Sequence, residues 1–284
     1  MSKKLWKSLV QKRSNMFKPV KLELAKKNKY FIQSILVGIF IYIVTQNIID
    51  LDPIQLLLLS FILVVSGSLI SHSTGITKEN FIYSIIMPLG VISGGILSLK
   101  FYPNLGSVFK IFVVMFFSGI YYLVSLADNI FLVVSDREEI IPLYRVAVTW
   151  SQILQVIVAI PLFAGIFKLN IITFSHSLII SSISFLFTYY QLWVYRFEPD
   201  AKKIEIGERF YICFLSFFIM FVTSLGVSFF PSEDFLRALF TSSVLLFVLN
   251  YISAHLKNEI TRRIIIRHLL ITVVFLILLI FFKP

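Results

Sequence analysis

Long apolar runs, separated by short polar breaks, occupy the chain from residue 31 onward. A membrane-spanning helix needs about 20 consecutive, mostly apolar residues, and nine runs approach that length. They cover residues 31–49, 54–71, 81–99, 108–133, 144–167, 171–195, 210–230, 235–254 and 264–282. The strands of an outer-membrane barrel would be shorter and would alternate in polarity. The sequence therefore predicts an all-α, polytopic transmembrane helical bundle with about nine spanning helices, in which residues 31–284 form a single domain.

The overall composition indicates that lipid is the main solvent of this chain. Hydrophobic residues make up 58% of the 284 residues, and the mean hydropathy is +0.89. Only 14% are charged, against about 25% in a typical soluble domain. This composition excludes a soluble enzyme, a disordered chain and a nucleic-acid-binding domain, and the single cysteine, Cys213, excludes a disulfide scaffold. The excess of 26 Lys and Arg over 15 Asp and Glu is therefore expected to face a membrane.

The first 30 residues form a basic segment that differs from the rest of the chain. The segment contains ten Lys or Arg residues and one acid, Glu23. Apolar residues recur at helical spacing between positions 5 and 10, ahead of Pro19, which should end a helix. Two interpretations stay open: an amphipathic helix held on the membrane by anionic headgroups, or a solvated basic tail. Membrane lipids are the predicted partner, and the sequence identifies no protein partner.

The distribution of basic residues among the polar breaks predicts the orientation of the chain. With nine spans and the N-terminus in the cytoplasm, the inner segments hold 21 Lys and Arg residues and the outer segments hold 5. A cytoplasmic membrane is the expected location, with the C-terminus outside. The ninth run is the weakest, because Arg267 and His268 lie about one turn inside it. A shallow helix that does not cross the membrane is the alternative for that run.

A polar stripe follows one face of the sixth run. Its six residues are spaced by three or four positions, which places them on one side of a helix. They are Ser177, Ser181, Ser184, Thr188, Gln191 and Tyr195. The stripe is interpreted either as the wall of a hydrated pathway or as a packing surface, because small Ser and Thr residues let helices approach closely. Gln191 is too large for the packing explanation and is the more informative member.

A polar pocket is predicted where the fourth and fifth runs meet. Its residues are Asp128, Asn129, Arg145, Gln152 and Gln155. The short connection between the runs predicts antiparallel neighbouring helices. Because charges inside a membrane are usually paired, we expect a salt bridge between Asp128 and Arg145. The pocket is interpreted either as a functional site that faces the cytoplasm or as a structural clamp on the hairpin.

Two further patterns concern packing and metals. The third run contains Pro88 and a GxxxG step from Gly90 to Gly94, which together predict a kink and close helix packing. The four histidines show no HExxH or other metal-ligand spacing. The sequence therefore predicts no metal and no cofactor.

Three classes of function stay open. A transporter or flippase for a small or lipid-linked substrate would use the polar stripe and the polar pocket as its pathway, and this class is favoured. A non-catalytic membrane scaffold or assembly partner would need only the packing. A membrane-embedded enzyme acting on a lipid is the third class, weakened because the chain has no Walker motif and no paired aspartate clusters. The arginine after Glu138 and Glu139 also comes two residues too late for the motif of CAAX-type intramembrane proteases.

Overall fold

The computed structural model describes residues 26–46, 53–71, 78–101, 106–137, 142–198 and 200–282. Within these ranges, every regular element is a helix. They are α2 (Lys26–Thr45), α3 (Pro53–Ser71), α4 (Lys78–Phe81), α5 (Tyr83–Phe101), α6 (Ser107–Arg137), α7 (Pro142–Phe167), α8 (Thr173–Tyr195), α9 (Ile206–Ser228), α10 (Asp234–Leu256) and α11 (Arg262–Phe281). Each predicted run coincides with one long helix, so the all-α fold is confirmed. Most of the basic N-terminal segment, residues 1–25, lies outside the described residues.

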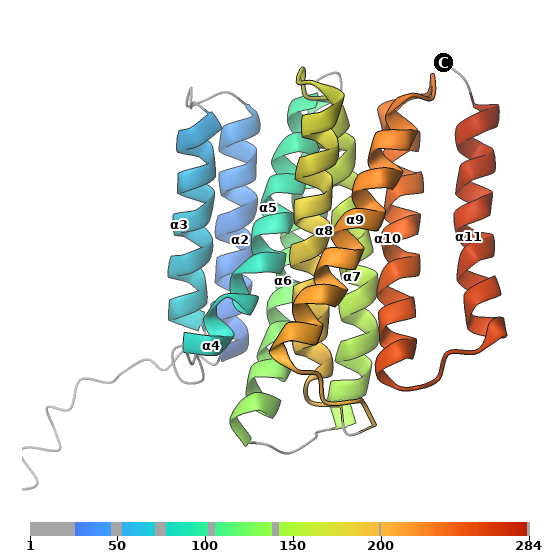
Figure 1. The fold of residues 1–284 in the computed structure, drawn as a ribbon. Helices are drawn as coiled ribbons and strands as arrows, with labels where there is room; N and C mark the ends of the chain where they lie inside the picture. Colours follow the sequence, from blue (N-terminus) through green and yellow to red (C-terminus); the bar gives the residue numbers. More distant parts are fainter. Residues whose placement is uncertain are drawn as a thin grey trace, which may run out of the picture.

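Consecutive long helices run in opposite directions, which gives the bundle two ends (Figure 1). The C-terminal end of α6 and the N-terminal end of α7 lie at the lower end in that view, as do the connections from α8 to α9 and from α10 to α11, and α11 ends at the upper end. Among the described residues, eight helices are long and apolar enough to cross a membrane, and α3 contains a shorter apolar stretch, Gln55–Ile70. This alternation brings the basic residues at the ends of these helices to the same end of the bundle: Arg137, Arg145, Arg196, Arg209, Lys257 and Arg262.

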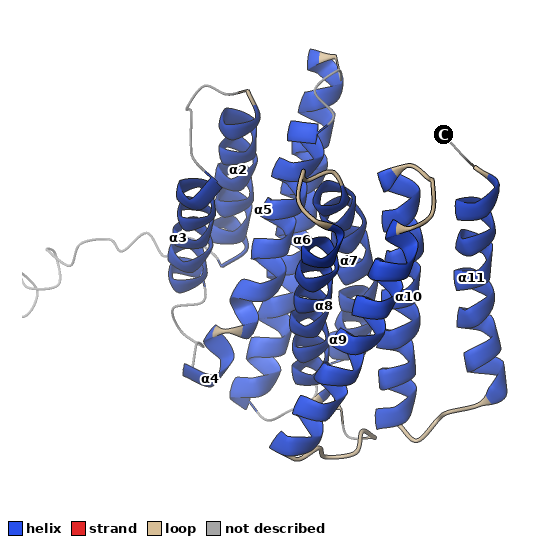
Figure 2. Ribbon diagram, turned by 45° about the horizontal axis from the view of Figure 1, so that its top comes forward, coloured by secondary structure: helices blue, strands red, loops and turns tan. Residues whose placement is uncertain are grey.

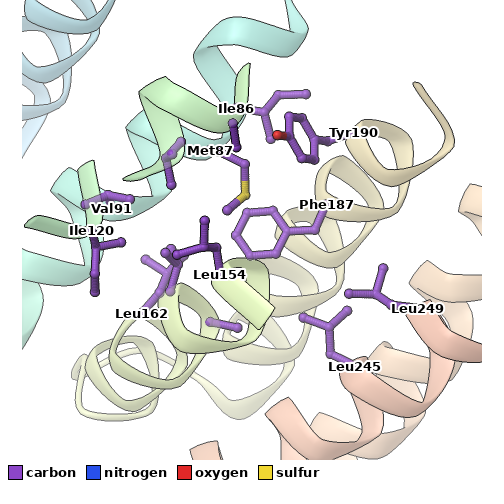
Figure 3. Close-up of a cluster of buried hydrophobic side chains, with 14 of the residues drawn as sticks. Ile86, Met87, Val91, Ile120, Leu154, Leu162, Phe187, Tyr190, Leu245 and Leu249 are labelled. Atoms are coloured by element: carbon purple, nitrogen blue, oxygen red, sulfur yellow. The ribbon is translucent and has the colours of Figure 1, made fainter. Parts of the chain in front are cut away.

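The hydrophobic core lies between α5, α6, α7, α8 and α10 (Figure 3). Met87 of α5, Leu154 of α7 and Phe187 of α8 gather at one point, and Leu245 and Leu249 approach from α10. α5 is the most enclosed of the candidate spans, with 67% of its span buried. The core therefore forms around the middle of the chain, and the first and last helices cover it from the outside.

Small residues on α5 let this helix approach its neighbours. A Cβ atom added at Gly90 would lie 3.2 Å from Val158 Cγ1 of α7, and one added at Gly95 would lie 2.9 Å from Ile41 Cδ1 of α2. Such short contacts mean that only glycine fits without a shift of the neighbouring side chain. The close packing predicted from the GxxxG step is therefore present, and α5 runs as one helix through Pro88.

The last helix, α11, stands at one edge of the bundle beside α10 (Figures 1 and 2). Only 6% of its span is buried, and its mean hydropathy of 2.9 is higher than that of the other candidate spans. Thr261 caps its first turn by accepting a hydrogen bond from the Ile264 amide at 3.4 Å. The ninth run thus forms a full-length helix that lies along α10, which favours the spanning interpretation over a shallow helix.

Candidate functional site

Asp128 is buried in α6 and does not meet Arg145. Its Oδ1 accepts a hydrogen bond from the Tyr190 hydroxyl of α8 at 2.6 Å, and its Oδ2 has no hydrogen-bond partner among the described residues. Only 1% of Asp128 is exposed, whereas 68% of the Arg145 side chain is exposed. The predicted salt bridge is therefore wrong. α6 continues to Arg137, beyond the predicted end of that run at residue 133, which places Asp128 deeper in the bundle than Arg145.

Asn129, the neighbour of Asp128, faces α2. Its Oδ1 accepts a hydrogen bond from the Tyr30 hydroxyl at 2.8 Å. Further along the same interface, Gln33 of α2 donates to the Tyr121 hydroxyl of α6. Asp128 and Asn129 thus tie α6 to α8 and to α2, respectively, rather than to α7 as the sequence predicted.

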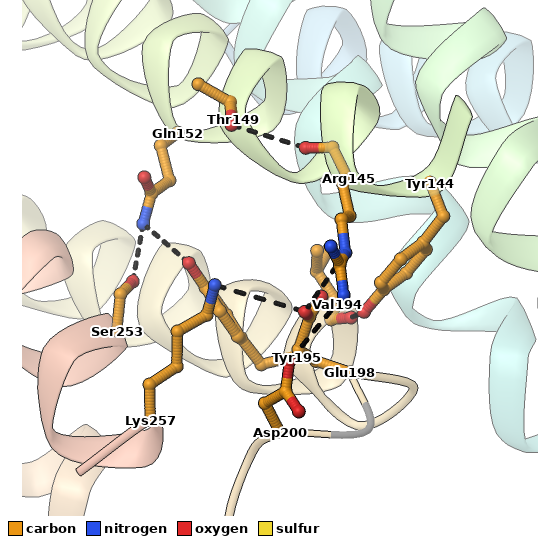
Figure 4. Close-up of polar contacts among 10 residues, drawn as sticks. All are labelled: Tyr144, Arg145, Thr149, Gln152, Val194, Tyr195, Glu198, Asp200, Ser253 and Lys257. Atoms are coloured by element: carbon orange, nitrogen blue, oxygen red, sulfur yellow. Dashed lines mark hydrogen bonds and ion pairs between the residues drawn. The ribbon is translucent and has the colours of Figure 1, made fainter. Parts of the chain in front are cut away.

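Glu198 joins three parts of the chain at one end of the bundle (Figure 4). Its Oε1 lies 3.8 Å from Arg145 Nε of α7 and 4.0 Å from the Nζ of Lys257, which follows α10. Arg145 Nη2 also lies 3.6 Å from Asp200 Oδ2. Because only 3% of the Glu198 side chain is exposed, its carboxylate is screened from solvent by the groups that it joins. For Arg145, these contacts favour the clamp interpretation, although the partner helices differ from those predicted.

Glutamine side chains bring the polar pocket and the polar stripe together between α7 and α8. Gln155 donates to Gln191 Oε1, and both residues are fully buried. Gln155 Oε1 and Gln191 Nε2 have no hydrogen-bond partner among the described residues. Nearer the end of the bundle, Gln152 donates to Ser253 of α10 and lies 3.5 Å from the Tyr195 hydroxyl (Figure 4). Two residue sets that were predicted separately thus form one interface.

The rest of the polar stripe is used in helix packing. Ser177, Ser181 and Ser184 are fully buried, and each hydroxyl donates to a backbone carbonyl one turn earlier in α8. Thr188 Oγ1 donates to Ser216 Oγ of α9 at 2.7 Å. Hydroxyls satisfied in this way let helices approach without leaving polar groups unpaired. These four positions support the packing interpretation of the stripe.

A groove of about 520 Å³, here called the arginine groove, lies between α5, α8 and α9. Arg196 follows the last turn of α8, and Arg209 lies in the first turn of α9. The rings of Tyr83 and Tyr189 stack with centroids 5.0 Å apart. The groove is lined by Ile82, Tyr83, Phe185, Tyr189, Arg196, Ile206, Arg209, Phe210 and Cys213. The groove thus combines two arginines with apolar and phenolic side chains, and Arg209 Nη2 donates to the Ile204 carbonyl at 3.3 Å.

An apolar groove of about 380 Å³ adjoins the arginine groove along α8 and α9. It is lined by Ser182, Phe185, Leu186, Phe214 and Phe217, so that Phe185 lines both grooves. The rings of Phe210, Phe214, Phe217 and Phe221 follow one face of α9, with successive centroids 6.3, 6.0 and 6.3 Å apart. This phenylalanine ladder runs from the arginine groove along the apolar groove toward the middle of α9.

The two grooves were missed at the sequence level, although signals for them exist. In the sequence, residues 196–209 form a polar break between two apolar runs, so Arg196 and Arg209 indicate only the orientation of the chain. The phenylalanines of α9 recur at positions 210, 214, 217 and 221, a spacing that marks one helix face. One sequence does not show which helix packs beside that face, so it cannot show that the face borders a groove.

The geometry defines a class: the chain is a multi-pass helical membrane protein with a polar interior and a basic, amphipathic groove on its side. No family model, curated protein or solved structure matches the chain.

Proposed function

We propose that this protein is a transporter or flippase whose substrate is an anionic amphiphile, such as a lipid-linked phosphate. The observation that carries the proposal is the arginine groove and its apolar continuation, which pair two guanidinium groups with a path of phenylalanine rings. The proposed orientation places the arginine groove at the cytoplasmic face of a cytoplasmic membrane, in agreement with the excess of basic residues at that end of the bundle.

The arginine groove has the chemistry of an anion site. Guanidinium groups form bidentate, charge-assisted hydrogen bonds with phosphate oxygens, and Arg196 and Arg209 both line the groove. Tyr83 of α5 and Tyr189 of α8 also line the groove, and tyrosine hydroxyls can donate to the same headgroup. Tyrosine is also suited to the membrane interface, where one end of the ring is apolar and the other is hydrated.

The apolar groove has the chemistry of a site for a hydrocarbon chain. Phe185 and Phe210 meet edge to face, with centroids 6.1 Å apart, where the two grooves adjoin. Phe214 and Phe217 continue the apolar lining along α9. Removing apolar surface from water stabilises binding by about 0.8 kcal/mol per buried CH₂ group; in a bilayer the gain is smaller, because lipid already surrounds the chain. The apolar groove would therefore orient the hydrocarbon chain of the substrate more than it would raise the binding affinity.

The interior of the bundle supports movement of a polar group more than a purely structural role. Asp128, Gln155 and Gln191 each keep one buried polar atom without a hydrogen-bond partner among the described residues. Leaving such a group unpaired inside the bundle costs about 1–3 kcal/mol, which a scaffold has no reason to retain. A protein that carries a polar headgroup across the membrane needs groups of this kind along the route.

Binding of a single-chain amphiphile tests the proposal. Native mass spectrometry of the purified protein with hexadecyl phosphate should show a bound complex, and hexadecyl phosphocholine, which is zwitterionic, should bind more weakly. Arg196→Gln and Arg209→Gln should each reduce the affinity for hexadecyl phosphate by about tenfold, because each removes a charge-assisted contact of about 1.5–3 kcal/mol.

The matched control is Arg262→Gln, in the exposed first turn of α11 and outside both grooves. This variant should bind hexadecyl phosphate like the native protein. Thermal unfolding in detergent shows whether each variant is folded before binding is measured. Equal affinity of the native protein and the Arg196→Gln, Arg209→Gln double variant contradicts the proposal.

A further inference from the structure

A column of polar side chains, here called the polar column, runs between α7, α8 and α10 from the Glu198 end of the bundle (Figure 4). Tyr195 and Gln191 contribute to it from one face of α8, because they are four residues apart. Tyr189, which lines the arginine groove, is two residues from Gln191 and so points to the opposite side of α8. The polar column is therefore separate from both grooves. Its members are Arg145, Gln152, Gln155, Gln191, Tyr195, Glu198, Ser253 and Lys257.

The outer part of the polar column is loosely spaced. Glu198 Oε1 lies 3.8 Å from Arg145 Nε and 4.0 Å from Lys257 Nζ, and Gln152 Nε2 lies 3.5 Å from the Tyr195 hydroxyl. Direct N–H···O hydrogen bonds span about 2.7–3.2 Å, and polar groups at longer separations are commonly bridged by water. Because 68% of the Arg145 side chain is exposed, this part of the column is in contact with solvent.

The inner end of the polar column holds two unpaired polar atoms. Gln155 lies one turn beyond Gln152 on α7, and its amide donates to Gln191 Oε1 of α8. Both residues are fully buried. Gln155 Oε1 can accept a hydrogen bond and Gln191 Nε2 can donate one, and neither has a partner among the described residues. A water molecule complements such a pair, because water both donates and accepts hydrogen bonds.

Apolar side chains close the polar column one turn beyond the glutamines. Phe187 precedes Gln191 by four residues, and its ring meets Leu154 of α7 and Met87 of α5 in the hydrophobic core (Figure 3). The column thus ends at the two glutamines. A site bounded in this way suits a small, neutral ligand that satisfies one donor and one acceptor.

We propose that Gln155 and Gln191 form a water-binding site, which water reaches from the Glu198 end of the bundle along the polar column. Glutamine side chains are long and unbranched, so a change of rotamer separates the two amides and admits a water molecule between them. Water bound there removes the cost of the two unpaired atoms. The inference does not depend on the proposed substrate, because the column shares no lining residue with the two grooves.

Radiolytic labelling of the native protein tests this site, because hydroxyl radicals formed from bound water oxidise the side chains beside it. Phe187 lies one turn from Gln191, whereas Phe163 lies two turns beyond Gln155 on α7. The two rings are equally buried, with exposed fractions of 1% and 0%, so Phe163 is the internal control. Phe187 should be oxidised about tenfold faster than Phe163, because a bound water stays beside it. Equal rates of oxidation would mean that no water binds at the glutamines.

Two variants test the site and the route separately. The Gln155→Leu, Gln191→Leu double variant removes the donor and the acceptor, so Phe187 should be oxidised as slowly as Phe163. Gln152→Leu leaves the site intact but places an apolar group in the route, and it should also slow the oxidation of Phe187. Thr149→Val, at an exposed position on α7, is the control for Gln152→Leu and should behave like the native protein.

The outcomes separate this inference from the proposed function. Fast oxidation of Phe187 in the double variant contradicts the water site, and fast oxidation in the Gln152→Leu protein contradicts the route. Binding of hexadecyl phosphate is measured in its own experiment and depends on the arginine groove. The water site therefore stands if the amphiphile does not bind, and the proposed function stands if Phe187 and Phe163 are oxidised at the same rate.

Discussion

Glu198 shows how a single side chain can hold one end of this bundle together. Its carboxylate lies between Arg145 of α7 and Lys257 after α10, although Glu198 itself belongs to the segment that follows α8. The backbone adds a further link, because the Lys202 amide donates to the Leu256 carbonyl at 2.7 Å. The ends of α7, α8 and α10 are thus joined through one buried acid.

Removal of the charge on Glu198 should destabilise the folded protein. Glu198→Gln keeps the shape of the side chain but leaves Arg145 and Lys257 without their shared carboxylate, and we expect a loss of about 1–3 kcal/mol. Asp200→Asn, whose side chain is 72% exposed, should cost at most about 1 kcal/mol, because exposed ion pairs contribute little. Thermal unfolding in mild detergent compares the two variants. If they unfold at the same temperature, Glu198 does not join the helix ends.

At this scale, the sequence predicts which residues are buried better than it predicts their partners. Asp128, Gln155 and Gln191 are polar residues within apolar runs, which predicts that they face the interior of the bundle, and all three are buried. Their partners depend on the rotation and register of neighbouring helices, which one sequence does not determine. Arg145 illustrates the point, because its acidic partners lie in the break after α8 rather than on α6.

The helix is the scale at which the sequence is most informative. Runs of apolar residues predict where each helix lies because the membrane requires every backbone polar group to bond within the segment. Position along the chain does not predict which faces meet. The spacing of the phenylalanines marks a face of α9, but the groove beside that face and the stacking of Tyr83 on Trp193 emerge only once α5, α8 and α9 are placed side by side.

Close packing between α5 and α7 should depend on Gly165. A Cβ atom added there would lie 2.4 Å from Leu97 Cβ, and neither atom is the end of a flexible side chain. Gly165→Ala should destabilise the protein by about 1–3 kcal/mol, as expected for an overpacked interface.

Gly119→Ala in α6 is the matched control, since nothing lies within 4 Å of its added Cβ. It should be neutral or stabilising by up to about 1 kcal/mol, because alanine favours a helix over glycine. Both variants are compared by thermal unfolding in the same detergent. A Gly165→Ala protein as stable as the Gly119→Ala protein would mean that α5 and α7 are not in close contact there.

The whole molecule combines three features: a bundle of apolar helices, a basic amphipathic groove on its side and buried polar groups in its interior. The bundle of apolar helices follows from the sequence, and the predicted orientation of the chain in the membrane stays a prediction. The groove and the polar interior follow from how the helices pack. Together they support transport of an anionic amphiphile, with the headgroup entering beside Arg196 and Arg209 and the chain following the phenylalanine ladder.

Movement of a labelled lipid between leaflets tests this central claim most directly. The protein is reconstituted into vesicles with a phosphatidic acid that carries a fluorescent label on one acyl chain, and dithionite, which does not cross the membrane, bleaches the exposed label. With the native protein, dithionite should bleach the label of both leaflets, because the lipid moves between them. With the folded Arg196→Gln, Arg209→Gln double variant, dithionite should bleach only the label of the outer leaflet. If bleaching with the native protein stops at the outer leaflet, as in protein-free vesicles, the protein does not carry this class of lipid and the account is contradicted.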